Sequence, residues 1–537
     1  MPKIQFRGFG GGLGHKVHDP RLSGYAICTN AITRFGVLMN GLKEVAEPTG
    51  IAAGFRTIKE IKHNDVQIRI THNGTNSKIY RIESGAWVLK ETVSSAKATD
   101  VISYHDGTNS ILAWCFGGDV AFRYSVDDGD NWTASTFSGT SDNPKFFLND
   151  QNNLTGPRVL WVVDPNELYF ASSLVNGTTI STSSTVGDAS SQEYFTSLMQ
   201  NDLGVVYLGK RHYLYAYANG PSVVVAGPHN DPPEDADAHS VRDNFENPQV
   251  MSNGWIIYQV EGYDLIAVRG RDIITNIAPR WTPRLNNWVL PRLELPINAI
   301  LAIGDYLIVA LGSGNTASNR GVVASPGAGN LLQNTFVTLS ELYVGQLINN
   351  EMVWHGSELT CTDLLRYLSY DENDGYMYLH SGASENANAQ AKRCFFFTSA
   401  PEITLSSSNI QLNVTASAVL ETAVIGASDP FDREVWDYIQ CLTTGLASSA
   451  PSLAAAIRLV PEHDTSSGFI TVETYHDGMR ALTGTSLRGH MQSGTVGRIR
   501  FTLAADSGSS PDVFGTLRSV ELTTSQFAKR KHGVGAL

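Results

Sequence analysis

The sequence predicts an all-β protein, a β-propeller of about seven four-stranded blades followed by a β-sandwich domain. Three observations carry this prediction. The chain has 49 glycines among 537 residues and only 17% charged residues, which suits many short strands joined by turns. Two consecutive segments share one pattern of four short strands. The second segment contains a hairpin with the pattern S-x-D-x-G-x-x-W.

The hairpin motif is an Asp-box, and Ser125, Asp127, Gly129 and Trp132 occupy its four defining positions. We expect the Asp127 carboxylate to accept backbone N–H bonds in the turn, Gly129 to adopt a positive φ, and Trp132 to pack into the sheet. The motif resembles the Asp-boxes on propeller blades of sialidases, other glycosidases and many non-enzymatic propellers. It therefore indicates an architecture rather than a reaction.

The propeller is expected over residues 51–400. The strands of its first two blades are predicted at residues 55–61, 66–71, 78–83, 87–91, 101–104, 111–116, 120–125 and 131–136. Trp87 and Trp132 each fall at the start of a fourth strand and stand 45 residues apart. This spacing is close to the roughly 40–50 residues of a four-stranded blade. Alternation of apolar and polar residues over 66–70 predicts one face toward the core and one toward water.

The later strands follow less regularly. Five more hairpins are each interpreted as the inner hairpin that starts a blade, at residues 159–171, 205–217, 255–268, 299–311 and 366–380. Together with the first two units they give about seven blades. Residues 401–525 are expected to form a separate β-sandwich, because strands with alternating apolar residues recur there between turns. Residues 526–537 are expected to form a basic mobile tail.

Residues 1–50 are expected to form an extended, Gly-rich arm. Its candidate assembly residues are Gly10, Gly11, Gly12, Leu13 and Asp19. The glycine run does not fit a phosphate-binding loop, because no Lys-Ser or Lys-Thr pair follows at the required offset. The segment has too little periodic apolar content to fold alone, so it should gain order by adding strands to its own propeller or to a neighbouring subunit. Deleting it should leave a folded propeller that no longer assembles.

Composition limits the function classes. The net charge of −13 and the lack of a basic stripe argue against specific nucleic-acid binding; the basic run at residues 529–532 is interpreted as a solvated tail or a weak contact. Five widely spaced cysteines without a C-x-x-C pair indicate buried free thiols rather than a zinc or dithiol site. No apolar run reaches the 18 or so residues of a membrane span, and the N-terminus has no signal-peptide pattern.

Several residues are candidates for chemistry, and each also has a structural explanation. Asp127, Asp128 and Asp130 could serve a glycosidase, but turn geometry explains them. No G-x-S-x-G elbow appears, and Cys115 and Cys394 lie in apolar strands. An acidic loop could bind a cation, although a solvated loop is favoured; its members are His229, Asp231, Glu234, Asp235, Asp237, His239 and Asp243. Residues 371–375 could bind Ca²⁺ but are more typical of a hairpin turn. Five tryptophans could stack on sugars but suit a propeller core: Trp87, Trp132, Trp255, Trp281 and Trp288. We expect no catalytic residue, metal or cofactor, and no enzymatic activity.

The order of these parts resembles a group of tailed-bacteriophage virion proteins, of which the tail-nozzle proteins of short-tailed phages are best known. The matching motifs lie near both ends of the chain: Gly11-Gly12-Leu13, Asp19-Pro20-Arg21-Leu22, residues 26–30, Gly36-Val37-Leu38, Tyr475-His476-Asp477-Gly478 and residues 517–522. The resemblance implies a structural protein of the virion tail that is made in the host cytoplasm. Its implied partners are further copies of itself in a cyclic homo-oligomer with six-fold symmetry, other tail proteins, and a host surface glycan. The alternative is a carbohydrate-binding or sialidase-like propeller that acts on glycans.

Overall fold

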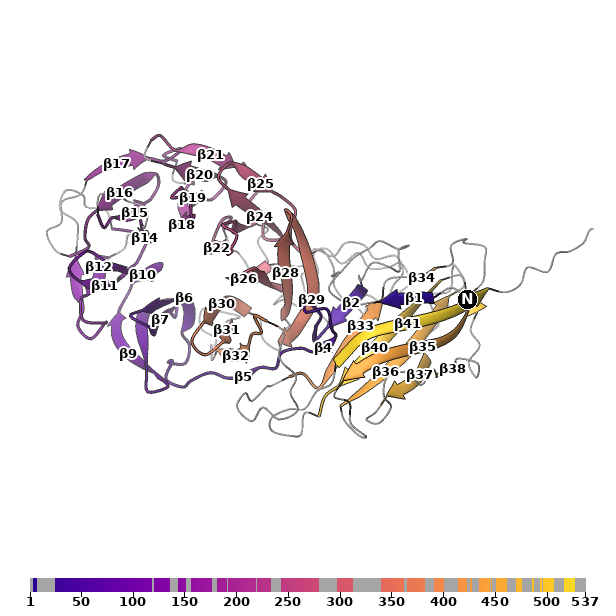
Figure 1. Ribbon diagram of the computed structural model, residues 1–537. Coiled ribbons are helices and arrows are strands. Elements are labelled where there is room, and N and C mark those ends of the chain that lie inside the picture. The colour runs from indigo at the N-terminus through magenta and orange to yellow at the C-terminus, as the bar shows by residue number, and fades with distance from the viewer. Residues whose placement is uncertain are drawn as a thin grey trace, which may run out of the picture.

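The computed structural model describes residues 3–6, 25–117, 120–135, 143–150, 156–175, 181–190, 192–218, 220–232, 243–279, 297–311, 340–361, 365–381, 391–399, 414–422, 425–426, 434–444, 446, 451–460, 470–475, 485–486, 493–494, 496–506 and 516–526. Within these ranges the named elements are all β-strands (Figure 1). None of the described segments is a helix long and apolar enough to cross a membrane.

Five four-stranded antiparallel sheets follow one another along the chain and form blades 1 to 5 of a ring (Figure 1). Blade 1 consists of β6 (Arg56–His63), β7 (Val66–His72), β8 (Ser77–Glu83) and β9 (Ala86–Val93). Blade 2 consists of β10 (Asp100–His105), β11 (Ser110–Cys115), β12 (Phe122–Ser125) and β13 (Thr133–Ser135). Blade 3 consists of β14 (Phe146–Asn149), β15 (Val159–Val163), β16 (Glu167–Ala171) and β17 (Ser181–Thr185). Blade 4 consists of β18 (Phe195–Gln200), β19 (Val206–Lys210), β20 (Leu214–Tyr217) and β21 (Val223–Ala226). Blade 5 consists of β22 (Gln249–Val250), β23 (Ile256–Val260), β24 (Asp264–Arg269) and β25 (Asp272–Ile274).

Two further blades complete the ring. Blade 6 consists of β26 (Ile297–Ile303), β27 (Tyr306–Leu311), β28 (Ser340–Ile348) and β29 (Glu351–Cys361). Blade 7 takes three strands from one part of the chain, β30 (Leu365–Asp371), β31 (Tyr376–Ser381) and β32 (Lys392–Phe395). Its fourth strand, β5 (Val45–Ala46), comes from before blade 1 and pairs with β32 in antiparallel register. The predicted all-β propeller of about seven blades is therefore confirmed, and a segment from the start of the chain closes it.

Three of the five expected inner hairpins are placed differently from the prediction. The hairpins at residues 159–171, 205–217 and 255–268 form the second and third strands of blades 3, 4 and 5. Their innermost strands, β14, β18 and β22, are short or of mixed polarity and so gave no clear apolar run. The hairpins at 299–311 and 366–380 do contain the first two strands of their blades.

The second strands of the blades are buried on both faces. Every residue of β15, β19 and β23 is buried, and so are five of the six residues of β11. Trp114, Trp161, Tyr207 and Tyr258 are among the largest fully buried side chains. Each blade packs between two neighbours in the ring, so neither face of these strands meets water, and near-continuous apolar runs are the result.

The prediction that one face of β7 meets water is also wrong, because that face packs against a neighbouring blade. Gln67 and Arg69 alternate with isoleucines and were expected to face water, but both are buried, and the Arg69 side chain is fully covered. Blade 7 packs against that face of blade 1, because β30 and β31 contact β6. A polar face in this fold thus points to a polar interface between blades rather than to solvent.

A β-sandwich follows the propeller, as predicted. One sheet has the order β1 (Lys3–Phe6), β41 (Thr516–Gln526), β35 (Glu434–Thr444) and β38 (Thr485–Ser486), with β39 (Ser493–Gly494) also paired to β35. The other has the order β2 (Tyr25–Thr29), β33 (Ser417–Thr422), β40 (Val496–Ala504), β36 (Ser452–Val460) and β37 (Ile470–Tyr475), with β34 (Ile425–Gly426) paired to β40. Leu420, Leu453, Phe501, Leu503 and Leu517 belong to the buried core between the sheets.

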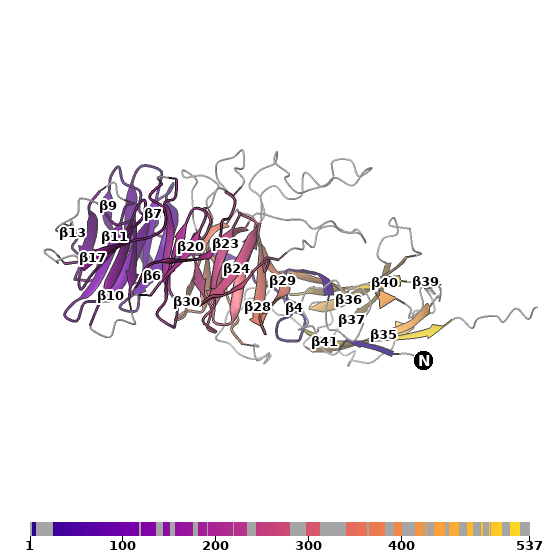
Figure 2. The same cartoon turned by 90° about the horizontal axis from the view of Figure 1, so that it is seen from above.

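The propeller and the sandwich share one ten-stranded sheet. Thr29 of β2 forms a parallel bridge with Ser357 of β29, which joins the sandwich strands to blade 6. Figure 2 shows the two bodies following one another along the long axis of the molecule. Blade 6 therefore belongs to both domains.

The described parts of the first 50 residues add strands to this same chain rather than standing apart as an arm. β1 and β2 enter the two sandwich sheets, β3 (Ala31–Ile32) pairs with β4 (Met39–Asn40) at the junction, and β5 closes the propeller. The expected gain of order by strand addition thus occurs within the chain, and it involves the sandwich as well as the propeller. Deletion of residues 1–50 would remove the closing strand β5, so from the structure we expect this deletion to destabilise the propeller, contrary to the prediction from the sequence.

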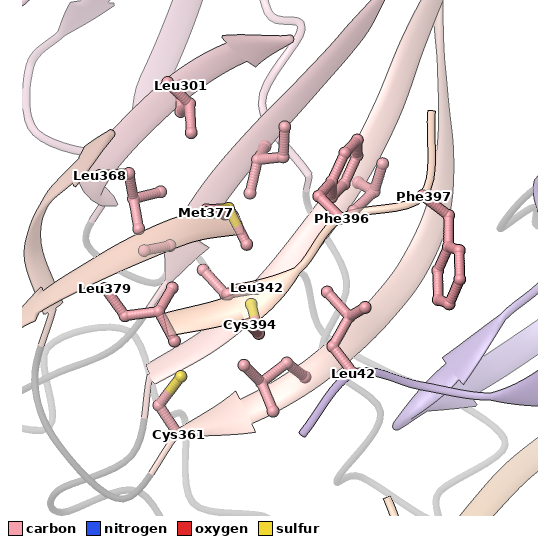
Figure 3. Close-up of a cluster of buried hydrophobic side chains, with 14 of the residues drawn as sticks. Leu42, Leu301, Leu342, Cys361, Leu368, Met377, Leu379, Cys394, Phe396 and Phe397 are labelled. Carbon is pink, nitrogen blue, oxygen red and sulfur yellow. The ribbon is translucent and has the colours of Figure 1, made fainter. Parts of the chain in front are cut away.

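A hydrophobic cluster holds the junction together. Leu42 from the N-terminal segment packs with Cys361 of blade 6 and with Cys394, Phe396 and Phe397 at the end of blade 7 (Figure 3). Arg34 lies beside this cluster and forms a fully buried ion pair with Glu358, with 2.7 Å between Nε and Oε1. A buried guanidinium with this partner ties the N-terminal segment to blade 6.

Candidate functional site

The predicted Asp-box residues form the turn between β12 and β13. The Asp127 carboxylate accepts hydrogen bonds from the backbone N–H (2.9 Å) and the side-chain amide (2.6 Å) of Asn131. Gly129 has φ +87° and donates its N–H to the Ser125 hydroxyl at 2.9 Å. Trp132 is half-buried and meets Trp114 edge to face, with 6.0 Å between ring centroids. Hydrogen bonds from Ser125 and Asn131 hold the pKa of Asp127 below its usual range.

The neighbouring aspartates of this turn connect blade 2 to blade 1. Asp130 forms ion pairs with Lys90 at 2.7 Å and Arg81 at 3.0 Å. Asp128 accepts a hydrogen bond from Asn64 at 2.6 Å and lies 3.2 Å from the buried His63 ring. The three carboxylates that could have suggested a glycosidase are thus engaged in the turn and in links between two blades.

The acidic loop considered for a metal is described only at its edges. Asp231 forms a bidentate pair with Arg211, with both distances 2.7 Å, and Asp243 accepts the Tyr194 hydroxyl at 2.7 Å. Glu234, Asp235, Asp237 and His239 lie outside the described residues. No group of three or more His, Cys, Asp or Glu side chains that could hold a metal occurs in the described part of the chain.

The remaining sequence candidates have simple placements. Asn373 donates its N–H to Asp371, and Tyr376 donates its N–H to Asp374, so residues 371–375 form a hairpin turn. Cys115 and Cys394 are buried, as are Trp87 and Trp255. The candidate arm residues and two of the tryptophans lie outside the described residues: Gly10, Gly11, Gly12, Leu13, Asp19, Trp281 and Trp288.

A cavity lies at one mouth of the propeller channel. It has a volume of about 500 Å³, and six blades line it near the beginnings of their innermost strands. The main contributions are residues 56–59, 97–100, 145–146, 195–199, 246–249 and 366–367. This site could not be predicted from the sequence, because its lining residues are short runs from strands that lie far apart in the chain.

The polar groups of the cavity wall form bridges between blades. Asp100 of blade 2 pairs with Lys59 of blade 1, with 2.5 Å between Oδ1 and Nζ, and accepts the backbone N–H of Phe147 in blade 3 at 2.8 Å. Lys145 pairs with Asp164 at 2.7 Å and lies over the Tyr194 ring. These bridges fix the spacing of the first four blades around the mouth.

A buried ionic cluster joins blades 1 and 7, where the ring closes. Arg69 donates from Nε to Glu60 and from Nη1 to Glu47, each at 2.8 Å, and its guanidinium lies 4.1 Å from the Trp87 ring centroid. His380 of blade 7 lies 3.5 Å from Glu60. Burial raises the pKa of Glu60 and of Glu47 against the lowering effect of Arg69, and burial lowers the pKa of His380. Arg69, a charged residue between two isoleucines of β7, was the one feature of the sequence that indicated this cluster.

No protein-family model and no curated protein matches the sequence. Solved structures with similar folds include YCF48 from Cyanidioschyzon merolae, at TM-score 0.41 and 10% identity over 66% of this chain and 98% of that one. The WD40 repeats of RRP9 give a TM-score of 0.42 at 8% identity, over 66% and 99% of the two chains. The Cps50 (Swd1) β-propeller domain of Myceliophteria thermophila gives 0.40 at 8% identity, over 66% and 100%. These similarities are loose, so the fold assignment rests on the sheet topology.

Proposed function

We propose that the chain is a structural component of a bacteriophage virion, a tail-nozzle or tail-tip protein that acts through assembly interfaces rather than catalysis. The proposal includes a cyclic homo-oligomer and other tail proteins as partners. It takes its starting point from the motifs near both ends of the sequence that resemble phage tail proteins.

One structural observation carries the proposal. Two of the segments that bear the resemblance, residues 36–38 and 517–522, lie far apart in the sequence, yet they are hydrogen-bonded to each other. Leu38 donates its N–H to the Leu517 carbonyl at 2.8 Å, and Leu517 donates back at 3.0 Å. Next to this bridge, Phe6 pairs with Val520 and Lys3 with Thr523. This adjacency is consistent with a common structural role for the two segments.

The shared sheet between the propeller and the sandwich gives this role a physical basis. Backbone pairing across a continuous sheet resists bending at the joint more than a flexible linker does. The buried Arg34–Glu358 pair and the hydrophobic cluster around Leu42 stiffen the same joint. A rigid two-domain subunit suits a ring in which every interface must repeat with the same angle.

The test uses the full-length protein. Size-exclusion chromatography with light scattering and electron microscopy should show a closed ring, with six subunits as the number implied by the resemblance. Antibodies against the protein should label the tail of the virions that contain it. A protein that stays monomeric at every concentration and is absent from virions would refute the proposal. A glycan array with a hydrolysis assay addresses the alternative, since robust turnover would favour a glycan-active propeller.

A further inference from the structure

We propose that one end of the propeller docks a protein segment that presents both apolar and basic side chains. This end, the far face, consists of the turns after the first and third strands of each blade and the strand halves that adjoin those turns. It lies opposite the cavity mouth, because the cavity is lined by the beginnings of the innermost strands. The inference holds whether or not the chain belongs to a virion.

The exposed apolar side chains of the propeller are gathered at the far face. Ten large apolar side chains are exposed among the described residues, and one of them, Leu442, lies in the sandwich. The other nine all lie at the far face. Four of these are Val88 and Leu89 on blade 1, Val126 on blade 2 and Ile348 on blade 6. Exposed apolar residues are normally scattered singly over a surface, so their confinement to one end indicates an interaction surface.

The largest group lies on blades 4 and 5, whose outermost strands β21 and β25 are neighbours on the rim of the ring (Figure 1). Its members are Leu203, Val223, Val224, Val250 and Ile273. Leu203 is the most exposed of them, at 64%. Its neighbour Asp202 reaches across to blade 5, where it lies 3.9 Å from Arg269. The turn that carries Leu203 therefore borders both blades.

Two members of this group face the same crevice. Val223 is paired with Ala216, and Ile273 is paired with Val268. Residues directly opposite each other on neighbouring antiparallel strands point to the same face of the sheet. Ala216 and Val268 both pack in the core between blades 4 and 5. Val223 and Ile273 therefore line the outer end of the crevice between these blades, and they form one apolar surface.

The far face is also acidic. Nine of its carboxylates are exposed but only three of its cations are, and two of these cations lie beside carboxylates of the same face. Asp305, Glu351 and Glu372 are exposed on the turns of blades 6 and 7, and they form no ion pair with a described residue. The negative charge therefore lies beside the apolar surface of blades 4 and 5, in the next blades of the ring.

This combination selects the chemistry of the partner. An acidic surface attracts basic segments and repels acidic ones. A second copy of this chain, with its net charge of −13, would place carboxylates against carboxylates if the two copies met through the same face. A segment that presents apolar side chains to blades 4 and 5 and Lys or Arg side chains to blades 6 and 7 satisfies both features.

Fluorescence anisotropy with the full-length protein and labelled peptides tests the proposal. The probes are an amphipathic helical peptide of leucine and lysine, the same peptide with glutamate in place of lysine, and the same peptide with serine in place of leucine. We expect the leucine–lysine peptide to bind with a Kd on the order of 10 μM at low salt and the other two to bind at least about tenfold more weakly. Equally tight binding of either altered peptide would overturn the proposal.

Two apolar variants locate the docking surface. Leu203→Ser combined with Val223→Thr should weaken binding of the leucine–lysine peptide about fivefold and leave the unfolding midpoint nearly unchanged, because both side chains are largely exposed. Leu442→Ser is the matched control, since Leu442 is also exposed but lies in the sandwich, and it should not alter binding. Equal binding by the double variant and the control would overturn the location.

Two charge variants test the acidic part. Glu351→Gln combined with Glu372→Gln should weaken binding about threefold. Asp188→Asn combined with Glu246→Gln is the control, because it removes two carboxylates at the other end of the propeller, and it should have no such effect. Light scattering of the unbound protein addresses the second copy as occupant. Self-association that is lost in the Leu203→Ser, Val223→Thr variant would show that another copy covers this face and would overturn the proposal.

Discussion

Arg69 offers the sharpest test of how the propeller ring is closed. Its side chain is fully buried between Glu60 and Glu47, which are themselves almost fully buried, so Arg69→Met would leave two carboxylates without their cation. Breaking a buried pair in this way costs about 3–5 kcal/mol, and loss of the contact with the Trp87 ring adds about 1 kcal/mol. Because a domain of this kind has a total stability of about 5–15 kcal/mol, we expect a large drop in the urea midpoint.

The stability lost in Arg69→Met should increase as pH rises. Burial raises the pKa of Glu60 and Glu47 above the ordinary value of 4.5, so the folded state holds these protons more tightly than the unfolded chain does. The stability from these protonated carboxyls is present below the ordinary pKa and is lost as pH rises through the raised, folded-state pKa. Without Arg69 the folded-state pKa values of Glu60 and Glu47 rise further. The difference between variant and wild type should therefore be small near pH 4 and largest near pH 8.

Urea unfolding followed by tryptophan fluorescence measures the change, and hydrogen exchange of β5, β6 and β30 locates it. Arg81→Met is the control, because Arg81 makes partly exposed ion pairs with Glu83 and Asp130 and its loss should cost much less than the loss of Arg69. Adding Glu47→Gln and Glu60→Gln to Arg69→Met should recover at least half of the lost stability. A loss below about 1 kcal/mol, or a loss that is equal at pH 4 and pH 8, would refute this account of the closure.

Four further predictions follow from the same contacts. Asp127→Ala should lower stability by about 1 kcal/mol through the lost turn hydrogen bonds, whereas Asp65→Asn, which keeps a residue that tolerates the positive φ of its exposed turn, should not; equal melting temperatures would contradict this. Gly209→Ala should cost about 1–3 kcal/mol because its β-carbon would strike Ser197 and Phe245, while Gly220→Ala, with open space around it, should be tolerated in the same melts. Burial, with the charge of Arg34, lowers the pKa of His355 to about 4, so stability should fall as pH drops from 6.5 toward 4, and His355→Gln should flatten that part of the urea-midpoint profile. Deleting residues 1–50 should cost at least about 3–5 kcal/mol through the lost Arg34–Glu358 pair alone, and an unchanged unfolding curve would show that β5 does not close the ring.

The sequence predicted those parts of the fold that depend on neighbouring residues. The strands of blades 1 and 2 lie close to their expected bounds, because tight turns with Gly and Asn separate short apolar runs. The two-residue strand β5 could not be predicted, since Val45-Ala46 has no local pattern and pairs with β32 far along the chain. Arg69 was wrongly predicted to face water. Its alternation with isoleucines is the same for a solvent-exposed face and for a polar interface between blades.

The cavity was beyond sequence reasoning for a different reason. Lys97 and Thr196 are ordinary surface-type residues in sequence, and only the circular arrangement of blades brings them to the same opening. Thr196 and Ser197 pack against Gly209 of β19 at the bulge in β18, so this contact joins two different strands. Neither feature leaves a signature in a single strand.

The position of β5 in the sequence means that this strand is synthesised long before the strand with which it pairs. Val45 and Ala46 leave the ribosome before any blade, but their partners Arg393 and Lys392 are made only after nearly all of the propeller. The interval is longer for β1, because its partners Val520 to Thr523 follow much later in the sequence. β1 and β5 therefore stay without their native partners until strands far along the chain are made. During that interval their unpaired strand edges are exposed to other chains, so we expect slow synthesis or a chaperone to favour correct closure over capture by a neighbour.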